Sequence, residues 1–158
     1  MSLKIIAAMS NNWVIGSENT IPWVNEADNN HFKQAIEGHD LIVGRKTYQT
    51  TWHLPRLIVL SREKLKVKDL HRDDTRIARS VDEVMSSCSP DTFVIGGEQI
   101  YRLFLPLAQR LYLTQINVAV PGDTFFPDFG RRQWQLVNDW RRKGCRFHVF
   151  EKVQNAVL

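Results

Sequence analysis

Short apolar segments alternate with helix-like segments along most of this chain, and no other feature of the sequence restricts the fold as strongly. Six segments are rich enough in Ile, Val, Leu or aromatic residues to form strands: residues 4–9, 40–44, 57–61, 76–78, 92–95 and 111–116. Helix-like segments lie between several of them, at residues 25–37, 45–50, 81–88 and 97–105. Strands that alternate with helices favour a largely parallel sheet covered on both faces. The sequence therefore predicts an α/β fold.

The C-terminal part of the chain has a different pattern. Residues 133–140 and 145–152 are strand-like, and the intervening Arg-Arg-Lys-Gly can turn a hairpin, which predicts an antiparallel edge to the sheet. The most polar segment, residues 62–75, is typical of a solvated connection. A chain of 158 residues usually builds one hydrophobic core, so we expect a single domain over residues 1–158.

Composition excludes several classes of protein. A hydrophobic share of 43% and a charged share of 24% are ordinary for a globular protein, so disorder is not expected. The first apolar run, residues 5–9, is too short for a membrane helix or a secretory signal. Cys88 and Cys145 lie far apart with no C-x-x-C motif or clustered histidine, which predicts reduced thiols and no metal site. We expect a cytoplasmic protein that does not bind a membrane.

The net charge of +4 favours an anionic partner, which could be a nucleic acid, a membrane surface, or a phosphorylated or carboxylated small molecule. The basic residues are spread along the chain, and the largest cluster is Arg141-Arg142-Lys143. Because RNA-binding aromatic motifs and zinc-finger spacing are absent from the sequence, a nucleic-acid-binding module is the weaker alternative.

A carboxylate shares the apolar face of the first expected helix. If Asn25 is the N-cap, then Asp28, Phe32, Ala35 and Ile36 fall on one face. One interpretation is that Asp28 only occupies the first helical turn, where an anion suits the helix dipole. The other is that the protein uses this carboxylate as a buried acid. The spacing alone favours the first interpretation.

The residues just before this helix favour the second interpretation. Pro22-Trp23 offers a rigid turn and a large ring that can shield one side of Asp28 from water. Burial raises the pKa of a carboxyl group, and an acid that is partly protonated near neutral pH can assist the reduction of a C=N bond in a heterocycle. The same carboxylate can accept two parallel N–H bonds from an amidine-like ring edge.

A second candidate site is the junction at residues 93–101, where an apolar segment ends in Gly96-Gly97 and opens into a helix. Glycines let a pyrophosphate approach the backbone, and the helix N-terminus supplies free N–H donors. The alternative is an ordinary Gly-Gly turn, since the chain has no G-x-G-x-x-G motif.

A similar junction lies at residues 41–47, where Gly44 is followed by Arg45, Lys46 and Thr47. Cations in a first helical turn oppose the helix dipole, which is expected if an anion binds there, although solvated surface charges are the simpler alternative. Ser61-Arg62 offers another hydroxyl and guanidinium at the carboxyl end of a strand, where ligands of open α/β sheets bind.

These motifs together resemble the dihydrofolate reductase family over nearly the whole chain and in the family's order. The matching segments are Ile6-Ala7-Ala8, Val14-Ile15-Gly16, Ile21-Pro22-Trp23, Asp28 with Phe32-Lys33, Val43-Gly44-Arg45-Lys46-Thr47, Leu60-Ser61-Arg62, Val94-Ile95-Gly96-Gly97, Tyr101, Leu113-Thr114, and Gly122-Asp123-Thr124 with Phe126-Pro127. The resemblance implies a three-layer αβα fold with a mostly parallel, mixed eight-stranded sheet, about four helices and an antiparallel C-terminal hairpin. It also implies an adenosine-binding subdomain at roughly residues 38–88.

For the reaction, the resemblance implies NADPH-dependent reduction of 7,8-dihydrofolate to 5,6,7,8-tetrahydrofolate, with a hydride to C6 and a proton to N5. This step feeds one-carbon metabolism and thymidylate and purine synthesis. Asp28 would hold the amino-pyrimidine edge of the pterin and promote proton delivery, Thr114 would orient Asp28, and Trp23 would support the site through water. Tyr101 would pack near the reacting rings. The pterin and nicotinamide pockets would be lined by Ile6, Ala8, Phe32 and Ile95.

For the cofactor, the resemblance implies a mobile loop at residues 14–20 that closes over the nicotinamide and is buttressed by Gly122 and Asp123. A 2′-phosphate near Arg45 and Arg62 would explain a preference for NADPH over NADH. The full set of implied cofactor-binding residues is Ala8, Val14, Ile15, Gly16, Ser17, Thr20, Gly44, Arg45, Lys46, Thr47, Ser61, Arg62, Arg79, Gly96, Gly97, Glu98, Gln99, Ile100 and Tyr101.

Some positions depart from the family pattern. Arg56 resembles the arginine that binds the carboxylate of the substrate's glutamate tail, but the loop before it, residues 51–56, is shorter than the family's usual loop. Asn29 and His31 stand beside Asp28 where apolar or aromatic residues are common, so the polarity of the pocket is expected to differ. The hairpin at residues 139–146 is also shorter than usual.

Two alternatives remain beside dihydrofolate reduction. A reductase of the same fold could act on another pterin or aminopyrimidine, but it would normally lack the Pro-Trp pair and the helix carboxylate. A basic nucleic-acid-binding module is the more distant alternative. We expect a monomer that acts on small molecules and does not bind nucleic acid.

Overall fold

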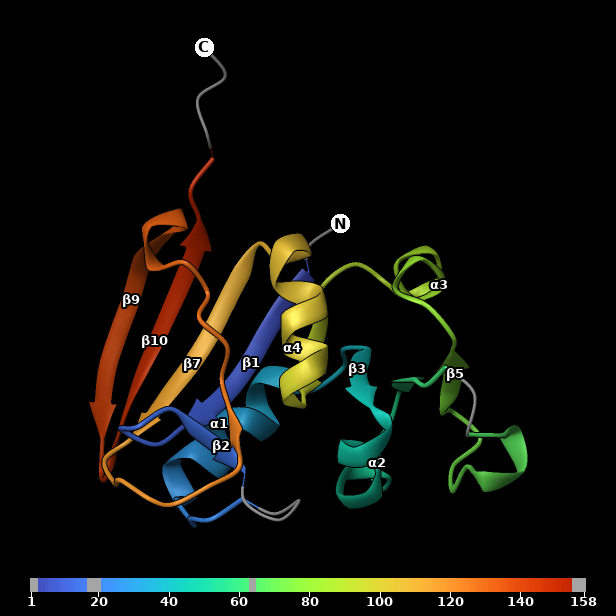
Figure 1. Cartoon of the computed structure of the whole chain (residues 1–158), viewed down its shortest axis with the longest axis horizontal. Helices are drawn as coiled ribbons and strands as arrows, with labels where there is room; N and C mark the ends of the chain where they lie inside the picture. Colours follow the sequence, from blue (N-terminus) through green and yellow to red (C-terminus); the bar gives the residue numbers. More distant parts are fainter. Residues whose placement is uncertain (1–2, 17–20, 63–64, 155–158) are drawn as a thin grey trace.

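The computed structural model describes residues 3–16, 21–62 and 65–154, and most of their strands form one mixed eight-stranded sheet (Figure 1). The order across the sheet is β5-β4-β3-β6-β1-β7-β10-β9. The strands are β1 (Leu3–Met9), β3 (Leu41–Gly44), β4 (Leu57–Leu60), β5 (Arg76–Ala78), β6 (Thr92–Gly96), β7 (Arg110–Ile116), β9 (Trp134–Arg142) and β10 (Cys145–Lys152). Pairings among β1 and β3–β7 are parallel, whereas β10 pairs antiparallel with β7 and β9. The predicted sheet is confirmed.

Helices cover both faces of this sheet. The described residues form α1 (Glu26–Ile36), α2 (Arg45–Thr51), α3 (Val81–Ser87) and α4 (Glu98–Phe104), with single 3₁₀ turns at Val67–Asp69, Leu105–Leu107 and Arg131–Gln133. Ile36 of α1 and Tyr48 of α2 pack with Leu41 and Val43 on one face, whereas Ile42 packs on the opposite face with the residues of α3 and α4. Successive strand side chains point to opposite faces, so one short strand serves two cores.

The central strands are buried along their whole length, which explains their unbroken apolar sequences. Every residue of β3, β4 and β6 is buried. A parallel sheet covered by helices on both faces has no solvent side, so its strands need no polar alternation. The predicted three-layer αβα arrangement follows from this burial and is confirmed.

The C-terminal hairpin is tighter than predicted. Strand β9 continues to Arg142, so the turn consists of Lys143 and Gly144 alone and not of the four residues from Arg141. Gly144 has a φ of +75°, and a residue without a Cβ is what a two-residue hairpin turn favours at such a position.

A second, two-stranded sheet was not among the predicted elements. It pairs β2 (Val14–Gly16) antiparallel with β8 (Thr124–Phe125). These strands are too short to give a periodic signal. The pairing brings residues 14–16, the start of the implied cofactor loop, against the segment that contains Gly122 and Asp123.

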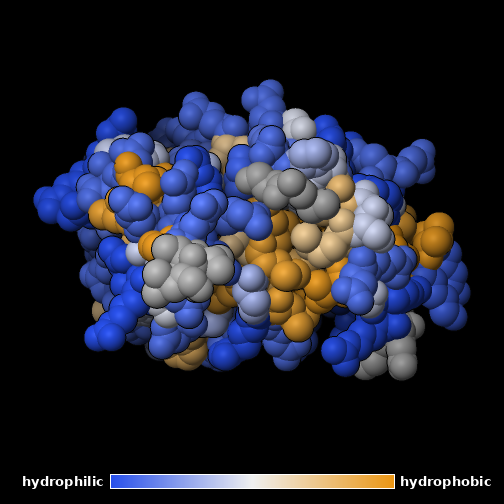
Figure 2. Space-filling view, turned by 90° about the horizontal axis from the view of Figure 1, so that it is seen from above, coloured by the Kyte–Doolittle hydropathy of each residue, from blue (hydrophilic) through white to orange (hydrophobic). Residues whose placement is uncertain are grey.

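The ends of the parallel strands lie on two opposite sides of the sheet, which we call its carboxyl edge and its amino edge. Their carboxyl ends point downward in Figure 1, towards β2 and α2, and their amino ends point upward. Figure 2 shows the molecule from above: the surface is largely hydrophilic, with an apolar patch near its centre and smaller apolar areas towards both ends. No helix formed by the described residues is long and apolar enough to cross a membrane.

Candidate active site

Asp28 lies in the first turn of α1, and the start of this helix is firmly anchored. The Asn25 side chain caps the helix by accepting the backbone N–H of Asp28 at 2.9 Å, and its Nδ2 donates to the carbonyl of Lys143 at 3.0 Å. The cap that the sequence predicted is therefore present. It also ties the first turn of α1 to the turn of the C-terminal hairpin.

The surroundings of Asp28 favour its protonated form. Burial of the carboxyl raises its pKa above the ordinary value, and a hydrogen bond with the side chain of Thr114 opposes this effect only in part. Thr114 is 1% exposed and lies on β7, where it pairs with Ala8 of β1. Thr114 and Asp28, which lie far apart in sequence, are thus direct partners, as the resemblance implied.

Tyr101 reaches towards the same region from the opposite face of the sheet. Its hydroxyl lies 2.9 Å from the carbonyl oxygen of Ile6 and 3.0 Å from that of Ile95, and its proton is donated to these oxygens. Burial, and then the charge of Asp28, raise the pKa of the phenol. Tyr101 therefore stays neutral and holds its hydroxyl between the adjacent strands β1 and β6.

Apolar side chains pack on two sides of α1, the helix that carries Asp28. Phe32 packs with the cluster that contains Ile6 and Ile95, and Trp23 and Ala8 pack with the cluster that contains Cys145 and Phe147. The structure thus brings the implied pocket residues to the α1 face of strands β1 and β6.

The two unusual polar neighbours of Asp28 point elsewhere. Asn29 is exposed. The ring of His31 packs against Phe147 and Trp140, with centroid distances of 4.4 and 5.7 Å, and burial lowers its pKa. His31 is therefore a neutral imidazole that packs among aromatic rings beneath α1. The expected change in the polarity of the pocket around Asp28 does not come from a charge on His31.

The two strand–glycine–helix junctions of the sequence meet in space, because β3 and β6 are neighbours. A Cβ on Gly44 would lie 2.7 Å from Cγ1 of Ile100, and one on Gly97 would lie 3.1 Å from Oγ1 of Thr47. The peptide bond between Gly96 and Gly97 is cis. The side chain of Ile100 on α4 thus packs against Gly44, and that of Thr47 on α2 packs against Gly97, so the two helix starts lie in close contact.

Charged and hydroxyl side chains surround this region at the carboxyl ends of the strands. Arg45 and Thr47 are partly exposed, and Lys46 and Arg62 are exposed. Ser61 is buried, and its N–H donates to Ala78 at 2.9 Å. These cations are available to an anion bound at the edge of the sheet.

Arg79 has a more structural position. Its guanidinium donates to the carbonyl of Ser61 at 3.0 Å and to that of Leu65 at 2.7 Å. Its backbone N–H donates to Glu83 at 2.8 Å. Arg79 thereby fixes the chain that leaves β4 beside Arg62.

Strand β2 is held by close packing. A Cβ on Gly122 would lie 2.2 Å from Cγ1 of Val14 and 2.7 Å from the carbonyl oxygen of Gly16. The backbone N–H of Asp123 donates to that carbonyl at 3.2 Å. Gly122 and Asp123 therefore support the start of the implied cofactor loop. The implied residues Ser17 and Thr20 lie outside the described residues.

The start of α4 carries a link that the sequence did not reveal. A side-chain oxygen of Glu98 accepts the backbone N–H of Phe125 at 3.3 Å and lies 3.6 Å from the guanidinium of Arg102. Glu98 thus joins the helix after Gly97 to strand β8. Its neighbour Gln99 is exposed on the same turn.

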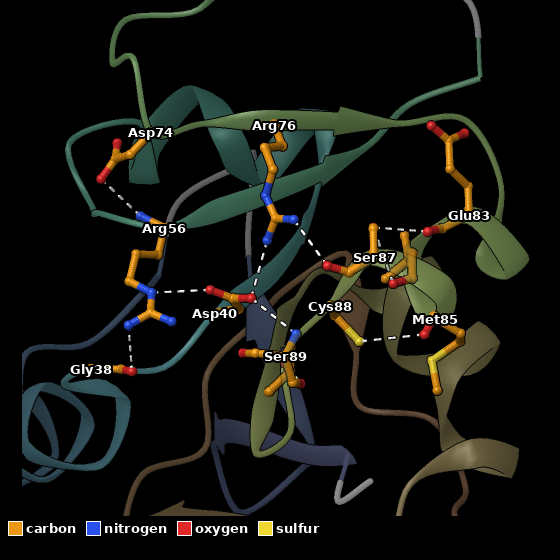
Figure 3. Close-up of polar contacts among 12 residues, drawn as sticks. Gly38, Asp40, Arg56, Asp74, Arg76, Glu83, Met85, Ser87, Cys88 and Ser89 are labelled. Carbon is orange, nitrogen blue, oxygen red and sulfur yellow. Dashed lines mark hydrogen bonds and ion pairs between the residues drawn. The ribbon is translucent and has the colours of Figure 1, made fainter.

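Arg56 lies at the opposite edge of the sheet from Gly44 and Gly96, just before β4. It forms an ion pair with Asp40, which was not among the predicted site residues (Figure 3). The only sequence signal was an acidic residue at the start of an apolar segment.

A pocket of about 410 Å³ lies beside α2. It is lined by Arg45, Tyr48, Gln49, Trp52, Leu65, Asp69 and His71. Only Arg45 belongs to the implied cofactor set, so this pocket is distinct from the region around Asp28. The described residues contain no group of three or more His, Cys, Asp or Glu side chains placed to hold a metal ion.

Known proteins resemble this chain over nearly its full length. The family model of dihydrofolate reductase matches residues 2–151. A dihydrofolate reductase of Staphylococcus haemolyticus is 34% identical over 168 aligned residues, covering 98% of both chains. That of Haemophilus influenzae is 35% identical, covering 96% of this chain and 99% of its own.

A solved structure shows the same architecture. It is a dihydrofolate reductase from Enterococcus faecalis complexed with NADP(H) and RAB-propyl, with a TM-score of 0.83, 25% sequence identity and 97% coverage of each chain. Sequence, fold and the arrangement around Asp28 agree, and the chain belongs to the dihydrofolate reductase family.

Proposed function

We propose that this protein is an oxidoreductase that reduces 7,8-dihydrofolate to 5,6,7,8-tetrahydrofolate at the expense of NADPH. The observation that carries the proposal is Asp28, a carboxyl group with a raised pKa on the apolar side of α1, bonded to Thr114. Family membership supports the reaction, and this geometry supports Asp28 as its acid.

The residues around Asp28 can hold both the substrate ring and a proton. The two carboxylate oxygens can accept parallel N–H bonds from the amino-pyrimidine edge of the pterin. The raised pKa keeps a proton available at higher pH than an exposed aspartic acid would, and this proton is destined for N5. Phe32, Ile6 and Trp23 limit the access of water.

The residues at the carboxyl edge fit NADPH, which supplies the hydride when it is bound. The start of α4 after Gly97 supplies backbone N–H groups that a pyrophosphate can bind. The close packing of Gly44 against Ile100 and of Gly97 against Thr47 brings this helix start and that of α2 together. Arg45 and Arg62 supply the cations for a 2′-phosphate. We include Ser61, within an adenosine-binding region at roughly residues 38–88, and the separate segment 96–101 in the same site.

Arg56 is proposed to bind the glutamate tail of the substrate. Helix α1 carries Asp28 near its start and Ile36 at its end, eight residues later, which corresponds to a rise of about 12 Å. The chain then returns through Gly38, whose carbonyl accepts a hydrogen bond from Arg56 at 2.7 Å. An elongated ligand whose ring binds Asp28 and whose body follows α1 past Phe32 therefore ends near this guanidinium.

We further propose that the protein acts as a cytoplasmic monomer in one-carbon metabolism, with residues 1–158 as one domain. Both cysteines are in the thiol form, and Cys145 is buried, which suits a reducing compartment. Size-exclusion chromatography with light scattering tests the monomer, and a dimer at micromolar concentration would contradict it.

The direct test mixes purified protein with NADPH and dihydrofolate and follows the consumption of NADPH. We expect turnover with NADPH and much weaker turnover with NADH. Turnover of another dihydropterin but not of dihydrofolate would favour a different reductase of the same fold. Replacement of Arg45 and Arg62 by Gln should raise KM for NADPH but not for NADH, because only NADPH carries the 2′-phosphate.

A further inference from the structure

Asp40 is the centre of a charged cluster at the amino ends of the parallel strands. It is 6% exposed and immediately precedes β3. Its Oδ1 accepts a hydrogen bond from Nε of Arg56 at 3.0 Å, and its Oδ2 accepts from Nη2 of Arg76 and from the backbone N–H of Ser89, both at 3.1 Å (Figure 3). Strands β3, β4 and β5 begin side by side, so the three charged side chains converge.

This carboxylate is ionised but does not cancel the positive charge around it. Burial opposes its ionisation, but the bonds from Ser89, Arg56 and Arg76 together hold its pKa below the ordinary value. The side chains of Arg56 and Arg76 are 46% and 45% exposed, whereas that of Asp40 is 8% exposed. Two cations therefore face solvent above one buried anion.

Arg56 is fixed at both its backbone and its side chain. Its backbone has a φ of +60°, and its N–H donates to a carboxylate oxygen of Asp74 at 3.2 Å. Asp74 is itself paired with Arg72 at 2.9 Å. Nη1 of Arg56 donates to Gly38, so Asp40 and Gly38 engage two of the five guanidinium N–H groups. Nη2 meets no acceptor among the described residues.

We propose that Asp40 is a positioning residue for substrate recognition, which holds the guanidinium of Arg56 ready for the carboxylate of the substrate's glutamate tail. The inference rests on the proposed role of Arg56 in the reductase. An arginine that is already ordered loses less side-chain freedom on binding, and its planar group recognises carboxylates in a fixed orientation. Asp40 itself does not contact the substrate.

The test compares dihydrofolate with a 7,8-dihydropterin that has a methyl group in place of the aminobenzoyl-glutamate. For Asp40→Asn we expect KM for dihydrofolate to rise by roughly fivefold to tenfold, because a mobile, unpaired arginine binds the tail less tightly. KM for the tail-less pterin and kcat for both substrates should change little. The readout is the KM ratio, which is KM for dihydrofolate divided by KM for the tail-less pterin. A loss of stability alone would not change this ratio.

Arg76→Gln is the matched control. It removes the other guanidinium from Asp40 and leaves the bond between Asp40 and Arg56 in place. We expect a similar loss of stability without a change in the KM ratio. Asp40→Glu keeps the charge and should recover part of the wild-type ratio.

Two results would overturn the inference, and they differ in what else they overturn. If Arg56→Gln raises the KM ratio but Asp40→Asn leaves it unchanged or lowers it, Arg56 binds the tail without help from Asp40. If Arg56→Gln also leaves the ratio unchanged while dihydrofolate is still reduced, the assignment of the tail to Arg56 fails as well. Turnover of dihydrofolate by the wild type tests the reductase itself.

Discussion

Two aspartates, the half-buried Asp28 and the buried Asp40, lie near opposite edges of the same sheet, and their pKa values are shifted in opposite directions. Burial disfavours the charged form of both. Asp28 has a hydrogen bond from one neutral hydroxyl, that of Thr114, and its pKa is raised. Asp40 has two guanidinium groups and a backbone N–H, and its pKa is lowered.

The difference shows that burial alone does not determine the charge state of a carboxyl group. Where the partners are cations and N–H donors, the carboxylate stays ionised and joins strand ends together. Where the partner is a single hydroxyl, the proton is held more tightly and becomes available for chemistry. The fold thus places an acid at one edge and an anion at the other.

The largest effect is expected for Asp28→Asn. The amide cannot supply the proton, so kcat at neutral pH should fall by about 10²- to 10⁴-fold. The loss should be smaller at acidic pH, where the substrate takes its proton from solvent. Rates of NADPH oxidation measured across pH test this expectation, and a loss that is independent of pH would show that Asp28 only positions the ligand.

The next effect is the loss of stability in Asp40→Asn. Breaking a buried pair costs about 3–5 kcal/mol, and because both arginines are half exposed we expect roughly 1–3 kcal/mol in urea unfolding near neutral pH. A carboxyl group whose pKa in the folded protein lies below the ordinary 3.8 stabilises the fold above that pH. This contribution is lost as the pH falls through the pKa of the folded protein. The difference from wild type should therefore shrink below about pH 4. An unchanged difference in acid would contradict this account.

A smaller effect is expected for Thr114→Val, which makes the surroundings of Asp28 still less like those of Asp40. Loss of the hydroxyl should raise the pKa of Asp28 further, so activity should persist to higher pH by up to about one unit. The rate should fall by less than about tenfold, because the acid itself remains. Thr114→Ser keeps the hydroxyl and serves as the control. A pH profile shifted towards acid would contradict the prediction.

The smallest effect is a gain in stability in Asp28→Asn. A carboxyl with a raised folded pKa contributes stability below its unfolded pKa, and this is lost as pH rises through the folded value. An asparagine side chain does not titrate, so the variant does not lose stability as the pH rises. It should be more stable than wild type at neutral pH by at most about 1 kcal/mol, with no difference near pH 3. Urea unfolding at both pH values checks the sign. A less stable variant at neutral pH would show that the carboxylate is compensated, as it is at Asp40.

Local features of the sequence predicted much of this protein. Apolar runs and helix-like segments placed the strands and helices, and the spacing of Asn25, Asp28 and Phe32 placed a capped acid on an apolar helix face. Gly44 and Gly96 marked the ends of two strands. Each of these inferences depends on residues close together in the chain, where periodicity and backbone geometry act directly.

Other features depend on the order of strands in the sheet, which local sequence does not encode. Asp40 meets Arg56 and Arg76 across 16 and 36 residues, and the hydroxyl of Tyr101 reaches Ile6 across 95. The turn of His31 towards Phe147 and Trp140, and the pairing of β2 with β8, arise in the same way. Local sequence thus indicates which groups the protein has and on which elements they stand. Which carboxyl group keeps its proton depends on the fold, because the partners of each group come from distant parts of the chain.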